Sequence, residues 1–116
     1  MRARKLRFHG HGSLKYVYKN AGTYRSRYYT VRAVTNPRRR HPRFTVVVSK
    51  KVHKSAVGRN RIRRRTYEIL RLAQPAIPGV VDVAVIVTNS EVLTADYGEL
   101  TQVLTSLLVQ ASVIQK

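Results

Sequence analysis

Five arginines lie within seven consecutive positions near the middle of the chain, in the segment Arg59-Asn60-Arg61-Ile62-Arg63-Arg64-Arg65. A guanidinium group presents a planar fork of N–H donors that matches two oxygens of a phosphate group, and an Asn amide can both donate and accept hydrogen bonds. Glu68 is the only acid nearby, so these cations would repel one another in a helix unless a polyanion relieved the repulsion. The segment therefore indicates a polyanion-binding surface.

Helical spacing divides this region into two faces, because successive residues of an α-helix are turned by about 100°. The stripe that should pack in the core contains Ile62, Thr66, Ile69 and Ala73. The opposite stripe, with Arg61 and Arg63 on its flanks, contains Asn60, Arg64, Tyr67 and Arg71. We expect the first stripe to face a sheet and the second to face the ligand.

Aromatic and basic residues alternate in a second region, where five tyrosines lie between residues 16 and 29 among Lys and Arg. Aromatic rings stack on bases, at about 1–3 kcal/mol per base, while neighbouring cations contact phosphates. If residues 24–34 form one strand, alternation places Tyr28 and Arg32 on one face and Tyr29 and Val31 on the other. We expect the face with Arg32 to meet a ligand.

Protein-side catalysis has little support in the sequence. Two-metal hydrolysis of a phosphodiester needs a cluster of carboxylates, whereas the five acids are spread along the chain from Glu68 to Glu99. His9 and His11 could share an ion, but the chain has no cysteine and no nearby carboxylate to complete a site. We expect no catalytic residue and no metal or other cofactor bound by the protein alone.

The distribution of charge supports nucleic-acid binding. The net charge is +18, and 22 of the 23 Lys and Arg residues precede residue 72, whereas four of the five acids follow it. A strongly basic patch on a small domain is typical of a nucleic-acid-binding protein. No apolar run reaches the roughly 18 residues of a membrane span, and no signal peptide is evident. We expect a cytoplasmic protein with no membrane partner.

The pattern of elements predicts one small α/β (α+β) domain over residues 13–116, preceded by a basic, flexible arm over residues 1–12. The predicted elements are a helix over 13–20, a strand over 24–34, a strand over 44–49, a helix from Lys54 or Ser55 to about Ala73, a strand over 80–87, and a last helix opened by Asp96 and Glu99. The strand over 44–49 is almost wholly apolar, which predicts burial on both faces. A helix between the last two strands makes them candidates for parallel neighbours.

The segment from Val48 to Arg64, Val-Ser-Lys-Lys-Val-His-Lys-Ser-Ala-Val-Gly-Arg-Asn-Arg-Ile-Arg-Arg, resembles the signature of the bacterial ribonuclease P protein component. Its hallmark is Arg-Asn-Arg with a Lys five residues earlier. The resemblance implies an αβββαβα order, with the first long strand split or bent, and a mixed sheet with a left-handed βαβ crossover and helices packed on it. This chain departs from the family at Tyr67, where the family has an arginine.

The resemblance also implies a function: a protein subunit of ribonuclease P, which assists an RNA enzyme in removing the 5′ leader of precursor tRNA. The residues that would bind the catalytic RNA are Lys54, Arg59, Asn60, Arg61, Arg63 and Arg64. The residues that would bind the leader are Leu14, Tyr18, Tyr28 and Arg32. Mg²⁺ would belong to the RNA-containing holoenzyme, and no protein oligomer is expected. A ribosomal or other structural RNA-binding protein is the alternative.

Overall fold

The computed structural model describes residues 22–35 and 41–113. The predicted arm and first helix, residues 1–20, lie outside these ranges. The described elements are β1 (Gly22–Arg25), β2 (Tyr29–Thr35), β3 (Arg43–Val47), α2 (Ala56–Ala73), the 3-10 helix η2 (Gln74–Ala76), β4 (Val81–Val87), the 3-10 helix η3 (Ser90–Leu93) and α3 (Tyr97–Gln110).

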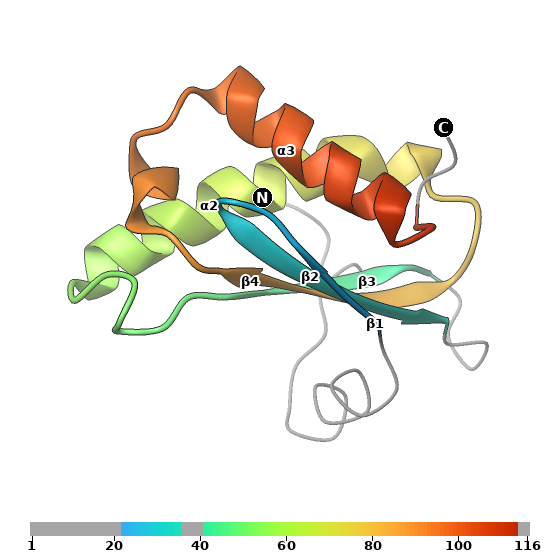
Figure 1. Cartoon of the computed structure of the whole chain (residues 1–116), viewed down its shortest axis with the longest axis horizontal. Helices are drawn as coiled ribbons and strands as arrows, with labels where there is room; N and C mark the ends of the chain where they lie inside the picture. Colours follow the sequence, from blue (N-terminus) through green and yellow to red (C-terminus); the bar gives the residue numbers. More distant parts are fainter. Residues whose placement is uncertain (1–21, 36–40, 114–116) are drawn as a thin grey trace.

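The strands form one mixed sheet in the order β1-β2-β4-β3. The pairs β1–β2 and β2–β4 are antiparallel, whereas β3 and β4 run parallel on either side of the connecting helix α2. Both α2 and α3 lie over the same face of this sheet (Figure 1). The described part is therefore a small α+β domain with the predicted parallel pair.

The region predicted as one strand over residues 24–34 is a hairpin instead. The backbone N–H of Ser26 donates to the Tyr29 carbonyl at 2.8 Å, and the Ser26 hydroxyl bonds the N–H and C=O of Tyr29. These bonds close a tight turn through Arg27 and Tyr28 between β1 and β2. Splitting the strand agrees with the order that the family resemblance implied, and it changes where Tyr28 points.

Strand β3 is not buried on both faces as its apolar sequence predicted. Phe44 and Val46 are buried beneath the helices, whereas Thr45 and Val47 are only partly buried. The prediction was wrong because an apolar run does not show how well its second face is covered. Strand β3 pairs with β4 and lies at one edge of the described sheet.

Helix α2 begins where the sequence predicts. The Ser55 hydroxyl accepts a hydrogen bond from the Gly58 N–H at 3.2 Å and so caps the helix. Gly58 also lets the helix approach the preceding loop, because a Cβ there would come within 2.1 Å of the His53 ring. The residues of α2 that are buried are Gly58, Ile62, Thr66, Tyr67, Ile69 and Leu70. The predicted core stripe is confirmed, although Ala73 is only partly buried.

Tyr67 was placed on the ligand-facing stripe, and this is wrong. Its side chain is 4% exposed, and its hydroxyl accepts a hydrogen bond from the Val46 N–H at 3.1 Å. The ring lies next to the buried stripe around the helix and is long enough to reach the outer strand. Tyr67 therefore satisfies a backbone donor of β3 and does not face solvent.

The last helix, α3, completes the core. The Asp96 carboxylate caps it by accepting from the Glu99 N–H at 3.1 Å, as the spacing of the two acids predicted. The buried residues of its apolar face are Leu100, Leu104, Leu107 and Leu108. Tyr97, the first residue of the helix, is 37% exposed.

A buried hydroxyl pair between α2 and β2 generates a test of this packing. The hydroxyls of Tyr29 and Thr66 share a hydrogen bond of 3.1 Å, and both residues have no exposed surface. Thr66→Val should lower the free energy of unfolding by about 1–3 kcal/mol, because it leaves a buried hydroxyl unpaired. Adding Tyr29→Phe should cost less than the sum of the two single changes. Urea denaturation of the four proteins measures this, and strictly additive losses would contradict the bond.

Candidate nucleic-acid interface

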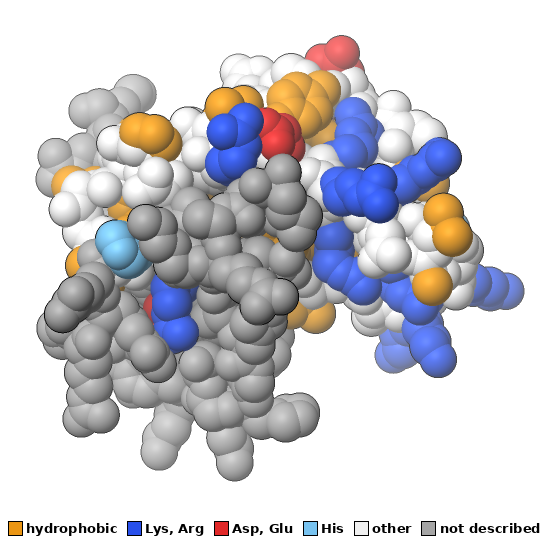
Figure 2. All heavy atoms as spheres, turned by 180° about the vertical axis from the view of Figure 1, so that it is seen from behind, with side chains coloured by type: hydrophobic (Ala, Val, Ile, Leu, Met, Phe, Trp, Pro, Cys, Tyr) orange, Lys and Arg blue, Asp and Glu red, His pale blue; other side chains and the backbone are white. Residues whose placement is uncertain are grey.

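The basic segment of α2 faces outward because its apolar stripe is fixed on the sheet. Ile62 is fully buried, whereas Asn60, Arg61 and Arg64 are exposed. Lys and Arg side chains gather on one side of the molecule when it is seen from behind (Figure 2). The predicted residues Asn60, Arg61 and Arg64 therefore share one accessible surface on this helix.

The acids of the chain are engaged elsewhere. Asp82 holds Arg43 through two bonds of 2.9 Å, and Glu91 pairs with Arg27 at 2.9 Å. The other contacts are Glu68 with Arg71, Glu99 with the Tyr28 hydroxyl, and Asp96 with the first turn of α3. Among the described residues, no salt bridge reaches the arginines between positions 59 and 65. Their positive charge is therefore uncompensated within this part of the chain.

Some of the residues that were predicted to bind RNA near the start of α2 also have structural roles. Arg59 Nη1 donates to the carbonyls of His53 at 2.9 Å and Lys54 at 2.8 Å, which ties the preceding loop to α2. The Lys54 side chain is exposed. Arg63 is only half-buried, but its Nη1 atom is buried and has no hydrogen-bond partner. A buried N–H donor without a partner is costly, so Arg63 has capacity for a further acceptor.

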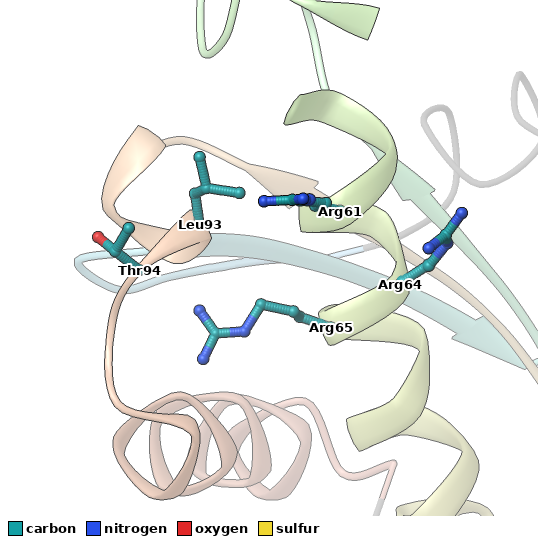
Figure 3. Close-up of a pocket in the computed structure, with 5 residues that line it drawn as sticks. All are labelled: Arg61, Arg64, Arg65, Leu93 and Thr94. Carbon is teal, nitrogen blue, oxygen red and sulfur yellow. The ribbon is translucent and has the colours of Figure 1, made fainter. Parts of the chain in front are cut away.

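A cavity of about 320 Å³ opens between α2 and the η3 turn. Its lining residues are Arg61, Arg64, Arg65, Leu93 and Thr94. Figure 3 shows Arg61 and Arg65 pointing from α2 toward η3, with Arg64 turned to the other side of the helix. The sequence analysis counted Arg65 in the arginine segment but did not include it among the RNA-binding residues, and it did not predict the η3 turn. The position of Arg65, one helical turn after Arg61, was a signal that the two side chains lie on the same side of the helix.

The sheet face opposite the helices carries Arg32. Its neighbour Val31 is fully buried on the helix side, so alternation places Arg32 on the other face. The register aligns Arg32 with Ala84 of β4, and Ala84 with Thr45 of β3. A small side chain thus lies between two polar ones at the middle of this face. Leu14 and Tyr18, which were predicted to act with Arg32, lie outside the described residues.

Tyr28 does not share this face, contrary to the prediction. The tight turn directs it toward α3, where it is 2% exposed and its hydroxyl donates to Glu99 at 3.0 Å. Desolvation by packing raises its pKa, and the bond to Glu99 adds to the shift. The guanidinium of Arg27 covers the ring at 5.2 Å and, by its bond to Glu91, lowers the pKa of that carboxyl group. A ring enclosed in this way cannot stack on a base.

Within residues 22–35 and 41–113, no three His, Cys, Asp or Glu side chains are grouped so that they could hold a metal ion. Over the same ranges, no helix has the length and apolar character needed to cross a bilayer.

Comparison with solved structures establishes the fold. The Staphylococcus aureus RNase P protein has a TM-score of 0.83 at 24% identity, with 95% of this chain and 98% of that chain covered. The Thermotoga maritima RNase P protein has a TM-score of 0.74 at 24% identity, with 84% and 89% covered. Both have the α+β arrangement described above.

Sequence comparison identifies the family. The ribonuclease P protein components of two Chloroflexus aurantiacus strains are each 38% identical over 81 residues, or 70% of this chain. The match spans 59% of the length of these relatives. The family model for ribonuclease P matches residues 2–112. Because that match covers almost the whole sequence, the chain belongs to the ribonuclease P protein family.

Proposed function

We propose that this chain is the protein subunit of ribonuclease P, which binds the catalytic RNA and the 5′ leader of precursor tRNA and assists endonucleolytic removal of that leader. The observation that carries the proposal is the uncompensated arginine surface on α2 in a member of this family. The alternative of a ribosomal or other structural RNA-binding protein gains no support from the relatives.

The catalytic RNA is proposed to lie along α2. Arg61 and Arg64 are exposed and would bind phosphate oxygens with their guanidinium forks. Asn60, which is exposed beside Arg64, would donate and accept at a sugar or base edge. Arg59 would act mainly by fixing the loop that presents Lys54, and Arg63, whose Nη1 is buried, would contribute its positive charge.

The leader is proposed to lie on the opposite sheet face. Arg32 supplies a cation there, and the sheet register aligns it with Ala84 of β4 and, beyond that, Thr45 of β3. Leu14 and Tyr18 would complete the site, with Tyr18 stacking on a base. Tyr28 is not among the proposed leader-binding residues, because it is buried against α3.

The chemistry is assigned to the RNA. Mg²⁺ prefers oxygen ligands such as carboxylates, but the five acids of the chain hold arginines, a tyrosine hydroxyl and a helix cap. The protein would contribute positive charge close to the RNA, where metal ions would otherwise be needed. It would do so in the cytoplasm, without forming a protein oligomer.

The test of the function is reconstitution. The protein alone should not cleave precursor tRNA in Mg²⁺, whereas with ribonuclease P RNA it should lower the Mg²⁺ concentration needed for half-maximal cleavage. The reason is that its arginines replace part of the charge that the RNA draws from ions. Gel analysis of 5′ leader release measures both quantities, and robust cleavage by RNA-free protein would contradict the proposal.

The α2 surface predicts a salt-dependent affinity for the catalytic RNA. If about six phosphates are neutralised, log affinity should fall with log salt with a slope near −4, at roughly −0.7 per contact. Arg61→Ala and Arg64→Ala should each flatten the slope by about one contact. Arg71→Ala is the matched control with a smaller effect, because Arg71 is already paired with Glu68. An affinity that is indifferent to salt would argue against this surface.

Separation of the two RNA surfaces predicts opposite effects of two variants. Tyr18→Ala should weaken holoenzyme binding of leader-bearing tRNA by about 1–3 kcal/mol, the loss of one stack, and leave leaderless tRNA unchanged. Arg61→Ala should first weaken assembly with the catalytic RNA. Tyr28→Phe, which removes a buried hydroxyl, should not discriminate between the substrates. Equal weakening of both substrates by Tyr18→Ala would make Tyr18 a packing residue.

A further inference from the structure

A helix whose arginines bind phosphates does not require a cavity such as the one between α2 and η3. Phosphate contacts need only a convex basic surface, whereas here Leu93 and Thr94 form a second wall across from Arg61 (Figure 3). The volume of about 320 Å³ lies at the lower end of the range for small-ligand sites, roughly 300–1,000 Å³. The shape therefore suits a single compact group that enters the protein surface.

Arg65 fixes the second wall. Its Nη1 donates to the Val92 carbonyl at 2.6 Å and its Nη2 to the Ala95 carbonyl at 2.5 Å. One guanidinium fork thus ties Val92 of η3 and Ala95, two residues beyond its end, to α2, across 27 and 30 positions of sequence. A wall held by two charge-assisted bonds is fixed before a ligand arrives, which lowers the entropic cost of binding.

The cavity is strongly positive. Three of its five lining residues are arginines and none is an acid. The two bonds of Arg65 to carbonyl oxygens engage two of its N–H groups without removing its charge. The nearest carboxylate along α2 is that of Glu68, which is bound to Arg71. Leu93 adds an apolar surface, so the cavity combines anion recognition with a place for an apolar or aromatic ring.

We propose that this cavity binds one unpaired nucleotide of the partner RNA, with its phosphate on Arg61 and its base against Leu93. The proposal rests on the function proposed above and extends it to the η3 turn. RNA-binding proteins recognise sequence mainly at unpaired nucleotides, whose bases can leave the stack and enter a protein pocket. Arg65 is a positioning residue that acts through the η3 turn.

The first test places a carboxylate at the rim. Thr94→Glu should weaken binding of ribonuclease P RNA by about tenfold or more, since juxtaposing like charges costs several kcal/mol. The matched control is Ser106→Glu, the same change of charge at an exposed position of α3, which should alter affinity by less than about twofold. Circular dichroism checks that both variants are folded.

The second test locates the nucleotide directly. The chain has no cysteine, so Thr94→Cys and Ser106→Cys each provide a single attachment point for a short photo-cross-linker. In the reconstituted protein–RNA complex, the Thr94 probe should cross-link to one or two adjacent unpaired nucleotides, and the Ser106 probe should not. Cross-links scattered over helical RNA, or none, would overturn the proposal. The absence of cross-links is also the result expected if an acidic protein segment were the true occupant.

The third test separates positioning from charge. Arg65→Lys keeps the cation but cannot bind both the Val92 and Ala95 carbonyls with one planar group. It should spread the Thr94 cross-links over more nucleotides and leave the salt dependence of affinity unchanged. An unchanged cross-linking pattern would mean that Arg65 does not position the wall.

The outcomes distinguish the inference from the function on which it rests. If Arg61→Ala and Arg64→Ala weaken RNA binding while Thr94→Glu and the Thr94 probe have no effect, the nucleotide site is wrong and the RNA-binding function stands. If neither arginine variant weakens binding, the proposed function itself fails.

Discussion

The seating of α2 on the sheet is the interaction on which the rest of the structure depends. Ile62, Ile69 and Leu70 are almost fully buried, and each such side chain contributes about 1.5–3 kcal/mol on burial. Turning the helix by one residue would expose this stripe and bury guanidinium groups without partners. The apolar side of α2 therefore decides which of its arginines reach solvent, and the parallel strands β3 and β4 at its two ends decide where they lie.

The positions of the acidic side chains also determine which arginines remain unpaired in the described part of the chain. The carboxylates hold a sheet arginine, a turn arginine, a helix arginine and a tyrosine hydroxyl, and each contact joins or stiffens elements of the fold. None is placed against the arginines from position 59 to 65 in the described part of the chain. The free protein thus keeps like charges close together on one helix. A bound polyanion would lower that repulsion, so RNA binding and the stability of α2 should be coupled.

Periodicity and capping residues were enough to predict α2, β4 and α3, because each is long and its pattern is set by its own residues. The hairpin between β1 and β2 escaped prediction, since its turn runs through Arg27 and Tyr28 without Gly, Asn or Pro and is closed by the Ser26 side chain. Tyr28 was assigned to the wrong face of the sheet because this hairpin was not predicted. The cavity was not predictable from the local sequence, because its second wall depends on Arg65 reaching carbonyls 27 and 30 residues away.

Tyr67 shows how a departure from the family pattern is accommodated. The family resemblance implies an arginine at this position, whereas here a ring packs in the core and its hydroxyl satisfies the Val46 N–H of the outer strand. A backbone donor at a sheet edge invites pairing with another chain unless something covers it. The substitution therefore protects β3 while it removes one cation from the helix. The exposed cations of α2 then lie mainly toward its other end, where Arg61 and the η3 turn flank the cavity.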